Sequence, residues 1–161
     1  MKRLIVAMAV IALSTATLQA QNKISAKKTV ISIAGNIGIP TSEGYSFAAG
    51  GDIQADFGVA EGLAITLSGG YENYSVKSSF GGGSGYFIPV LAGAKFPFST
   101  NLYGHAQLGY GFGKGGGGAF AYAPSVGYNF SPNFDASLKY LAFSKSGSTL
   151  GSVNLRLAYN F

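Results

Sequence analysis

Residues 45–59, YSFAAGGDIQADFGV, alternate between apolar side chains and small or polar ones along the whole segment. The even-numbered positions include Asp52, Gln54 and Asp56, whereas the odd-numbered positions carry mainly aromatic and aliphatic groups. A period of two is typical of a β-strand, because successive side chains of a strand point to opposite faces. The segment therefore predicts a long strand with one apolar face, which consists of Tyr45, Phe47, Ala49, Ile53, Ala55, Phe57 and Val59.

The same alternation recurs before and after this segment. No stretch after residue 20 reaches the roughly 18 consecutive apolar residues of a membrane-spanning helix, but a tilted strand crosses a bilayer with only about 9–11 residues. Hydrocarbon offers no partner to a free strand edge, so strands in a membrane must close into a barrel. We predict an all-β fold, a transmembrane antiparallel up-and-down β-barrel whose eight strands are residues 28–39, 45–59, 63–74, 86–98, 102–112, 119–130, 134–143 and 149–161.

The connections between these segments predict the two ends of the barrel, because barrels have short periplasmic turns and longer outer loops. The short turns are residues 60–62, 99–101 and 131–133, and the outer connections are residues 40–44, 75–85, 113–118 and 144–148. Aromatic residues then gather at both rims, as the girdles of membrane barrels do. The periplasmic girdle is expected to hold Phe57, Phe96, Phe98, Tyr128, Phe130, Phe134, Tyr159 and Phe161. The outer girdle is expected to hold Tyr45, Phe47, Tyr71, Tyr86, Tyr110, Phe112, Phe120 and Tyr122.

The N-terminal residues have the layout of a secretory signal peptide. Lys2 and Arg3 precede an apolar run from Leu4 to Leu13, and small and polar residues then lead to a cleavage point after Ala20. We therefore expect residues 1–20 to be a cleaved signal peptide and residues 21–161 to form one outer-membrane β-barrel.

The composition suits a surface that faces lipid rather than water. Charged residues make up 11% of the chain, against about 25% in soluble domains, and aromatic residues make up 14%. The chain has no cysteine, so disulfides do not stabilise it. The formal net charge is +5, but the basic residues form no stripe. This scatter argues against binding to nucleic acid.

Three segments resemble the outer-membrane β-barrel domain family, the small eight-stranded barrels similar to OmpA and OmpX of Gram-negative bacteria. They are residues 87–98 (FIPVLAGAKFPF), 101–113 (NLYGHAQLGYGFG) and 153–161 (VNLRLAYNF). The resemblance implies a monomer in the cell outer membrane, in contact with outer-membrane lipid including lipopolysaccharide. It also implies that the barrel-assembly machinery reads the last strand through Phe161. It does not define an activity, because this fold serves many roles.

Seven ionisable side chains are predicted to point into the barrel, most of them in its periplasmic half. Buried charges need partners, so we interpret this set as a mutually neutralising plug; a path for protons or ions is the alternative. An open pore is not expected, because eight strands enclose just enough room for side chains. The plug consists of Asp52, Asp56, Lys95, His105, Asp135, Lys139 and Arg156.

An enzyme is not expected. A lipid hydrolase or acyltransferase needs a histidine beside a serine and a carboxylate, close to its lipid substrate. His105 is the single histidine, and its position predicts that it points inward near the periplasmic end. The glycine-rich run 113–118 matches GxGxxG, but neither Ser nor Thr follows Lys114 and no strand–helix unit surrounds it, so we interpret it as a loop. We expect no cofactor and no metal.

Two groups near the outer end are candidate interaction sites. Lys77, Lys114 and Lys145 lie in outer connections, either as solvated tips or as contacts for lipopolysaccharide phosphates. Bulky apolar residues are predicted to face inward near the mouth, among small positions such as Ala48 and Ala121. They either fill the barrel or line a pocket for a small hydrophobic ligand. This candidate pocket consists of Phe87, Pro89, Leu91, Leu141, Phe143 and Leu150.

These observations leave three functional hypotheses. The first is a structural or surface-interaction barrel of the cell envelope. The second is a binder or narrow conduit for small hydrophobic molecules. The third, which the single histidine argues against, is a lipid-modifying enzyme.

Overall fold

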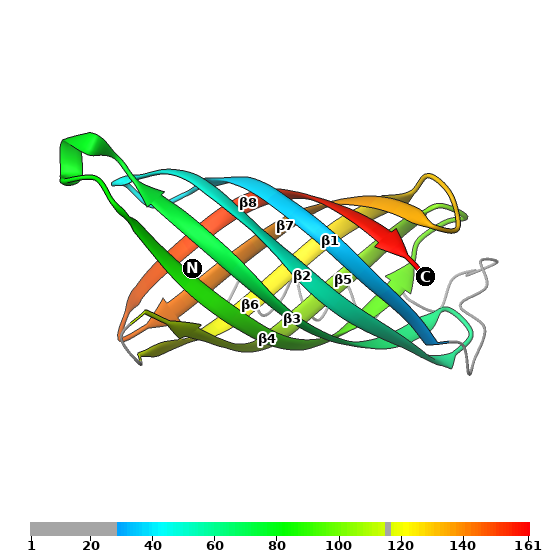
Figure 1. Ribbon diagram of the computed structural model, residues 1–161. Coiled ribbons are helices and arrows are strands. Elements are labelled where there is room, and N and C mark those ends of the chain that lie inside the picture. Colours follow the sequence, from blue (N-terminus) through cyan, green and yellow to red (C-terminus); the bar gives the residue numbers. More distant parts are fainter. Residues whose placement is uncertain (1–28, 115–116) are drawn as a thin grey trace.

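The computed structural model describes residues 29–114 and 117–161, which form one closed antiparallel barrel (Figure 1). Each strand pairs with its neighbours in sequence, and β1 closes the barrel by pairing with β8. The predicted fold is therefore confirmed, while the proposed signal peptide lies outside the described residues. The strands are β1 Thr29–Pro40, β2 Tyr45–Ala60, β3 Leu63–Val76, β4 Ser84–Pro97, β5 Leu102–Gly113, β6 Gly118–Asn129, β7 Phe134–Lys145 and β8 Ser148–Asn160.

The alternation of the sequence becomes an inner and an outer face of the barrel wall. On β1, Ile33 and Ile37 lie outside and are 53% and 56% exposed, whereas Ser32, Ala34 and Asn36 point inward and are buried. Burying these outer side chains in hydrocarbon is favourable by about 25 cal/mol for each Å² of apolar surface removed from water. The apolar face of the wall is therefore its outer face.

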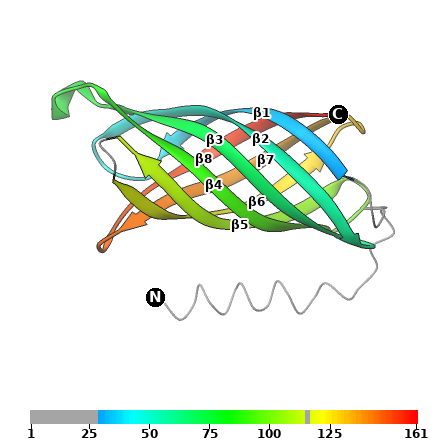
Figure 2. The ribbon, with the colours of Figure 1, turned by 60° about the horizontal axis from the view of Figure 1, so that its bottom comes forward.

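The end that holds Thr29 and Phe161 is called the terminal end, and the opposite end is called the mouth (Figure 2). The β3–β4 connection contains a short 3-10 helix, η1 Ser78–Phe80, and it projects past the other connections at the mouth (Figure 1). No helix of residues 29–114 and 117–161 has both the length and the apolar character to cross a membrane.

The connections at the mouth are shorter than predicted, because the strands continue further. Residues 144–148 do not form a loop. Lys145 and Ser148 are paired, and Ser146 and Gly147 form a two-residue turn with φ values of 49° and 86°. Positive φ at both positions is the signature of a type I′ hairpin, whose twist matches that of the flanking strands. Lys145 is therefore held at the end of β7.

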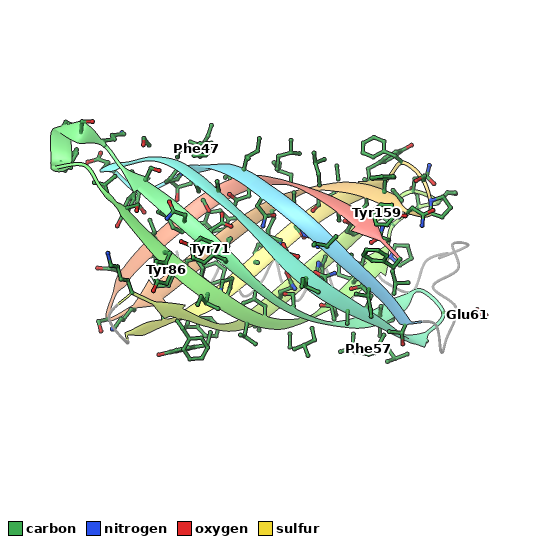
Figure 3. The ribbon with its side chains drawn as sticks, in the orientation of Figure 1. Phe47, Phe57, Glu61, Tyr71, Tyr86 and Tyr159 are labelled. Carbon is green, nitrogen blue, oxygen red and sulfur yellow. The ribbon has the colours of Figure 1, made fainter. Side chains whose placement is uncertain are left out.

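Aromatic side chains lie at both ends of the outer wall, as the alternation predicted (Figure 3). At the terminal end the rings of Phe96 and Phe98 contact each other, as do those of Tyr159 and Phe161. Near the mouth, Tyr71 stacks on Tyr86 with 5.4 Å between ring centroids. Rings at the two water–hydrocarbon interfaces are typical of membrane barrels.

The prediction for Tyr45 was wrong. A β-bulge separates Tyr45 from Phe47 in the pairing with β3, and one extra residue reverses the face on which the side chains before it lie. Tyr45 points into the barrel, where its ring meets that of Tyr74 edge-on at 5.9 Å. Phe47 remains on the outer wall (Figure 3).

Candidate functional site

The interior of the barrel divides into a polar layer and an apolar layer. The polar layer fills the middle and the terminal half, and the apolar layer lies below the mouth. All these positions belong to the inward face of the strands. The two layers arise because the inward-facing residues change from polar to apolar along the length of the strands.

Asp52 of β2 is the centre of the polar layer. Arg156 of β8 binds its carboxylate in bidentate fashion, with Nη2–Oδ1 at 2.7 Å and Nε–Oδ2 at 3.0 Å. Lys139 of β7 places its Nζ 3.6 Å from Oδ2, and Asn36 of β1 donates to the same oxygen at 3.2 Å. Charge-assisted bidentate pairs are among the strongest polar contacts in proteins. These contacts connect β1 and β2 with β7 and β8 through the interior of the barrel.

Asp135 of β7 extends this network toward the terminal end. Its carboxylate accepts hydrogen bonds from the Tyr103 hydroxyl and from the Asn160 side chain, and Nη1 of Arg156 lies 3.8 Å from Oδ1. The Tyr103 ring lies directly against Gly127, where an added Cβ would overlap the ring atoms. Glycine therefore provides the space in which this interior tyrosine reaches its carboxylate.

A second ion pair joins Asp56 and Lys95. The Lys95 Nζ lies 3.2 Å from Asp56 Oδ2, and it also sits over the Tyr103 ring, 4.1 Å from the ring centroid. Gln54 donates to the other carboxylate oxygen at 2.6 Å. Lys95 therefore has an ionic and a cation–π partner, which stabilises its charge inside the barrel.

His105 lies within this polar layer and away from the outer wall. Its Nε2 and the Thr66 hydroxyl are 2.8 Å apart, and the residue is 5% exposed. The structure therefore brings all seven ionisable residues predicted for the interior into the lumen. Asp52, Lys139, Arg156 and Asp135 form one connected set, whereas Asp56 and Lys95 form a separate pair.

Glu72 of β3 is an interior charge that the sequence interpretation missed. It is 2% exposed, its Oε1 has no hydrogen-bond partner among the described residues, and its other oxygen lies over Gly50. The described interior thus holds four acids rather than three. The even-numbered alternation of β3 assigns Glu72 inward, and this signal would have identified it.

The apolar layer packs tightly just below the mouth. Phe87 and Phe143 stack with their centroids 4.2 Å apart, and Tyr74 meets both rings edge-on. The Phe143 ring lies on Gly111, which leaves no room for a side chain there. Leu91 and Leu141 lie deeper, buried together with the interior alanines. The barrel is therefore filled at the level of the leucines.

A cavity of about 380 Å³ opens above this layer at the mouth. Phe87, Phe143 and Leu150 line it, so three of the predicted pocket residues surround a real space, whereas Leu91, Leu141 and Pro89 do not line it. Lys114 and Lys145 also line the cavity, but Lys77 does not. The sequence placed all three lysines at this end without separating them. The remaining apolar lining comes from Tyr45, Tyr74, Tyr86 and Ala119.

The glycine-rich segment forms the β5–β6 connection at the same cavity. Gly113 donates its backbone N–H to the carbonyl of Gly117, which brings together the ends of two adjacent strands; residues 115–116 lie outside the described part of the chain. The segment joins strand to strand, which supports the interpretation as a loop rather than a phosphate-binding turn before a helix.

A closed barrel of eight antiparallel strands, with an apolar outer wall and aromatic rims, is the architecture of small outer-membrane barrels. Solved structures of that class match the chain over most of its length. The attachment invasion locus protein Ail of Yersinia pestis is 19% identical with a TM-score of 0.61, covering 83% of this chain and 97% of Ail.

Two further matches are the N-terminal barrel domain of Pseudomonas aeruginosa OprF and Neisserial surface protein A. The OprF barrel is 16% identical with a TM-score of 0.56, and the match covers 82% of this chain and 97% of that one. Neisserial surface protein A is 15% identical with a TM-score of 0.55, over 83% and 97%. No protein-family model and no curated protein sequence matches. The chain therefore has the small outer-membrane barrel fold that its sequence resembles.

Proposed function

We propose that this protein resides in the outer membrane of a Gram-negative cell and acts there as a structural and surface-interaction barrel. One observation carries the proposal: a band of exposed isoleucine, leucine and valine side chains encircles the wall between two aromatic rims. Such a wall is stable only in contact with hydrocarbon. Structural neighbours of this fold include an outer-membrane protein whose name denotes attachment.

The filled interior supports a structural role over a conduit. The Asp52 network joins strands on opposite sides of the closing β1–β8 pair, and the Phe87–Phe143 stack lies across the lumen nearer the mouth. Eight strands leave little space beyond these side chains. We therefore place the surface interaction at the mouth, and we propose a non-catalytic monomer.

We propose that the mouth lysines bind anionic groups of the outer leaflet. Lys77, Lys114 and Lys145 are all exposed at this end, and ammonium groups are suited to phosphate. The lipid A part of lipopolysaccharide is the expected partner because it surrounds an outer-membrane protein at this level. A structure of the Yersinia pestis neighbour contains the heparin analogue sucrose octasulfate, a polyanion bound by a barrel of this fold.

Replacing all three lysines with glutamine is expected to reduce the lipopolysaccharide that co-purifies with the barrel. Each exposed ion pair contributes only about 0.2–1 kcal/mol, so three pairs together should lower retention about threefold or more. Phosphate assay of the purified protein, normalised to folded barrel, measures the change. The matched control replaces the same three residues with arginine, which keeps the charge and should retain lipopolysaccharide. Equal retention by the glutamine variant would remove this part of the proposal.

A second function is favoured by the mouth cavity. Its volume of about 380 Å³ falls within the range of small-molecule sites, roughly 300–1,000 Å³, and aromatic and aliphatic side chains form its floor. We therefore propose, as the second candidate, that the barrel binds a small hydrophobic molecule at its mouth. The packed layer of Leu91 and Leu141 beneath the cavity favours binding over passage through the lumen.

A further inference from the structure

The mouth cavity combines an apolar floor with a one-sided charge. Tyr74, Phe87 and Phe143 close its inner end, while Lys114 and Lys145 stand at its rim on the neighbouring β5–β6 and β7–β8 hairpins. The Lys145 Nζ lies over Gly117, 3.0 Å from the position that a Cβ of that glycine would occupy. The Lys145 side chain is therefore directed across the rim toward the β5–β6 connection.

The charge at this rim is positive only. Among the described residues that line the cavity there are two lysines and no carboxylate. The acid of the β1–β2 connection, Glu43, is not part of the lining, and Glu72 is buried on β3 opposite Phe87, below the floor residues rather than among the lining. A neutral apolar ligand would offer neither ammonium group a charged partner inside the cavity, and a cationic ligand would be repelled by both.

We propose that the cavity binds small anionic amphiphiles, with the apolar body on the Phe87–Phe143 floor and the anionic head between Lys114 and Lys145. The class is a medium-chain or aromatic carboxylate with one negative charge. This inference rests on the second candidate function and names its ligand class. Lys77 has no part in it, because its side chain lies outside the cavity.

Methyl NMR of the barrel in phosphatidylcholine nanodiscs tests the proposal with octanoate as the probe. The methyl groups of Leu150, which lines the cavity, should shift and saturate as octanoate is added. Those of Leu157 on the same strand face outward, so they report only partitioning of the probe into the bilayer. Octylamine has the same chain with the opposite charge and should leave the Leu150 resonances unsaturated at the octanoate midpoint.

Substitutions test separately how the charged rim and the apolar part of the cavity contribute to octanoate binding. Lys114→Gln combined with Lys145→Gln should weaken octanoate binding about fivefold, the effect of removing two exposed ion pairs. Lys77→Gln, the matched control at the same end, should change it less than about twofold. Ala119→Phe places a ring in the cavity and should abolish the Leu150 shift. If that variant does not fold, Ser148→Phe fills the rim from β8 instead.

The outcomes divide cleanly between the two proposals. Equal saturation by octanoate and octylamine, or unchanged octanoate binding in the double glutamine variant, would overturn the anionic ligand class. Octanoate shifts that survive in the filled variants, or that appear equally at Leu157, would overturn the cavity site itself. Neither result bears on lipopolysaccharide retention, which is a separate readout, measured on the triple variant that also replaces Lys77. The surface role can therefore stand or fall independently.

Discussion

Asp52→Asn should lower the free energy of unfolding by about 3–5 kcal/mol, the cost of removing one partner from a buried ion pair. The substitution keeps the shape of the side chain but leaves Arg156 and Lys139 facing an amide inside the barrel. Their side chains are only 4% and 6% exposed, so water cannot replace the lost carboxylate. Urea unfolding of the barrel in detergent micelles, followed by the gel shift between folded and unfolded bands, measures the change.

Asp56→Asn is the matched control for this prediction. Lys95 loses its carboxylate in that variant but keeps the Tyr103 ring 4.1 Å below its Nζ, and it is more exposed than Arg156. We expect a smaller loss, about 1–3 kcal/mol. If the two substitutions cost the same, or if Asp52→Asn costs less than about 1 kcal/mol, the Asp52 network is not the centre of the interior.

Leu155→Arg should destabilise the barrel in a bilayer by about 2–4 kcal/mol, the cost of a cation on the lipid face near the midplane. Leu155 lies near the middle of β8, faces outward, and is paired with Ile37 and Leu138 on the neighbouring strands. No interior partner is reachable from that face, so the guanidinium must thin the bilayer or move toward an interface. Folding into vesicles of phosphatidylcholine across a urea series gives the free energy.

Ile31→Arg is the corresponding control at the edge of the wall. Ile31 faces outward on β1 as Leu155 does on β8, but it lies close to Phe161 at the terminal end. The cost of a charge on the lipid face falls to about 0–1 kcal/mol near an interface. Equal costs at the two positions would contradict the placement of Leu155 near the bilayer midplane and of Ile31 near an interface, which the aromatic rims indicate.

The strands and their faces were predictable because alternation is a local property. Along most of β1 and β8 the apolar and polar positions alternate, so the pattern correctly predicted Ile37 outward and Arg156 inward. The interior pairing of Asp52 with Arg156 joins residues far apart in the sequence. Alternation predicts the face on which each residue lies. It does not predict the register between strands, and the register decides which residues become partners.

Apart from Glu72, which alternation places inward, the errors occurred where the local pattern changes. The bulge after Tyr45 reverses the face of that residue, and the tight turn at Ser146 and Gly147 shortens a connection that appeared to be a loop. The difference between Lys145 at the cavity and Lys77 outside it depends on which hairpins border the cavity. None of these features has a periodic signal, so they required the structure.

Nuclear Overhauser effects from lipid acyl chains to the protein's own methyl groups test the central claim most directly, without any substitution. In deuterated, methyl-protonated barrel in nanodiscs, the methyl groups of Ile37, Leu108 and Leu155 should show strong effects from lipid methylene protons. Those of Leu91 and Leu141, which are 3% and 4% exposed inside the barrel, should show none. Contacts of the outward methyl groups with water instead of lipid, or equal lipid contacts inside and outside, would contradict a wall solvated by hydrocarbon.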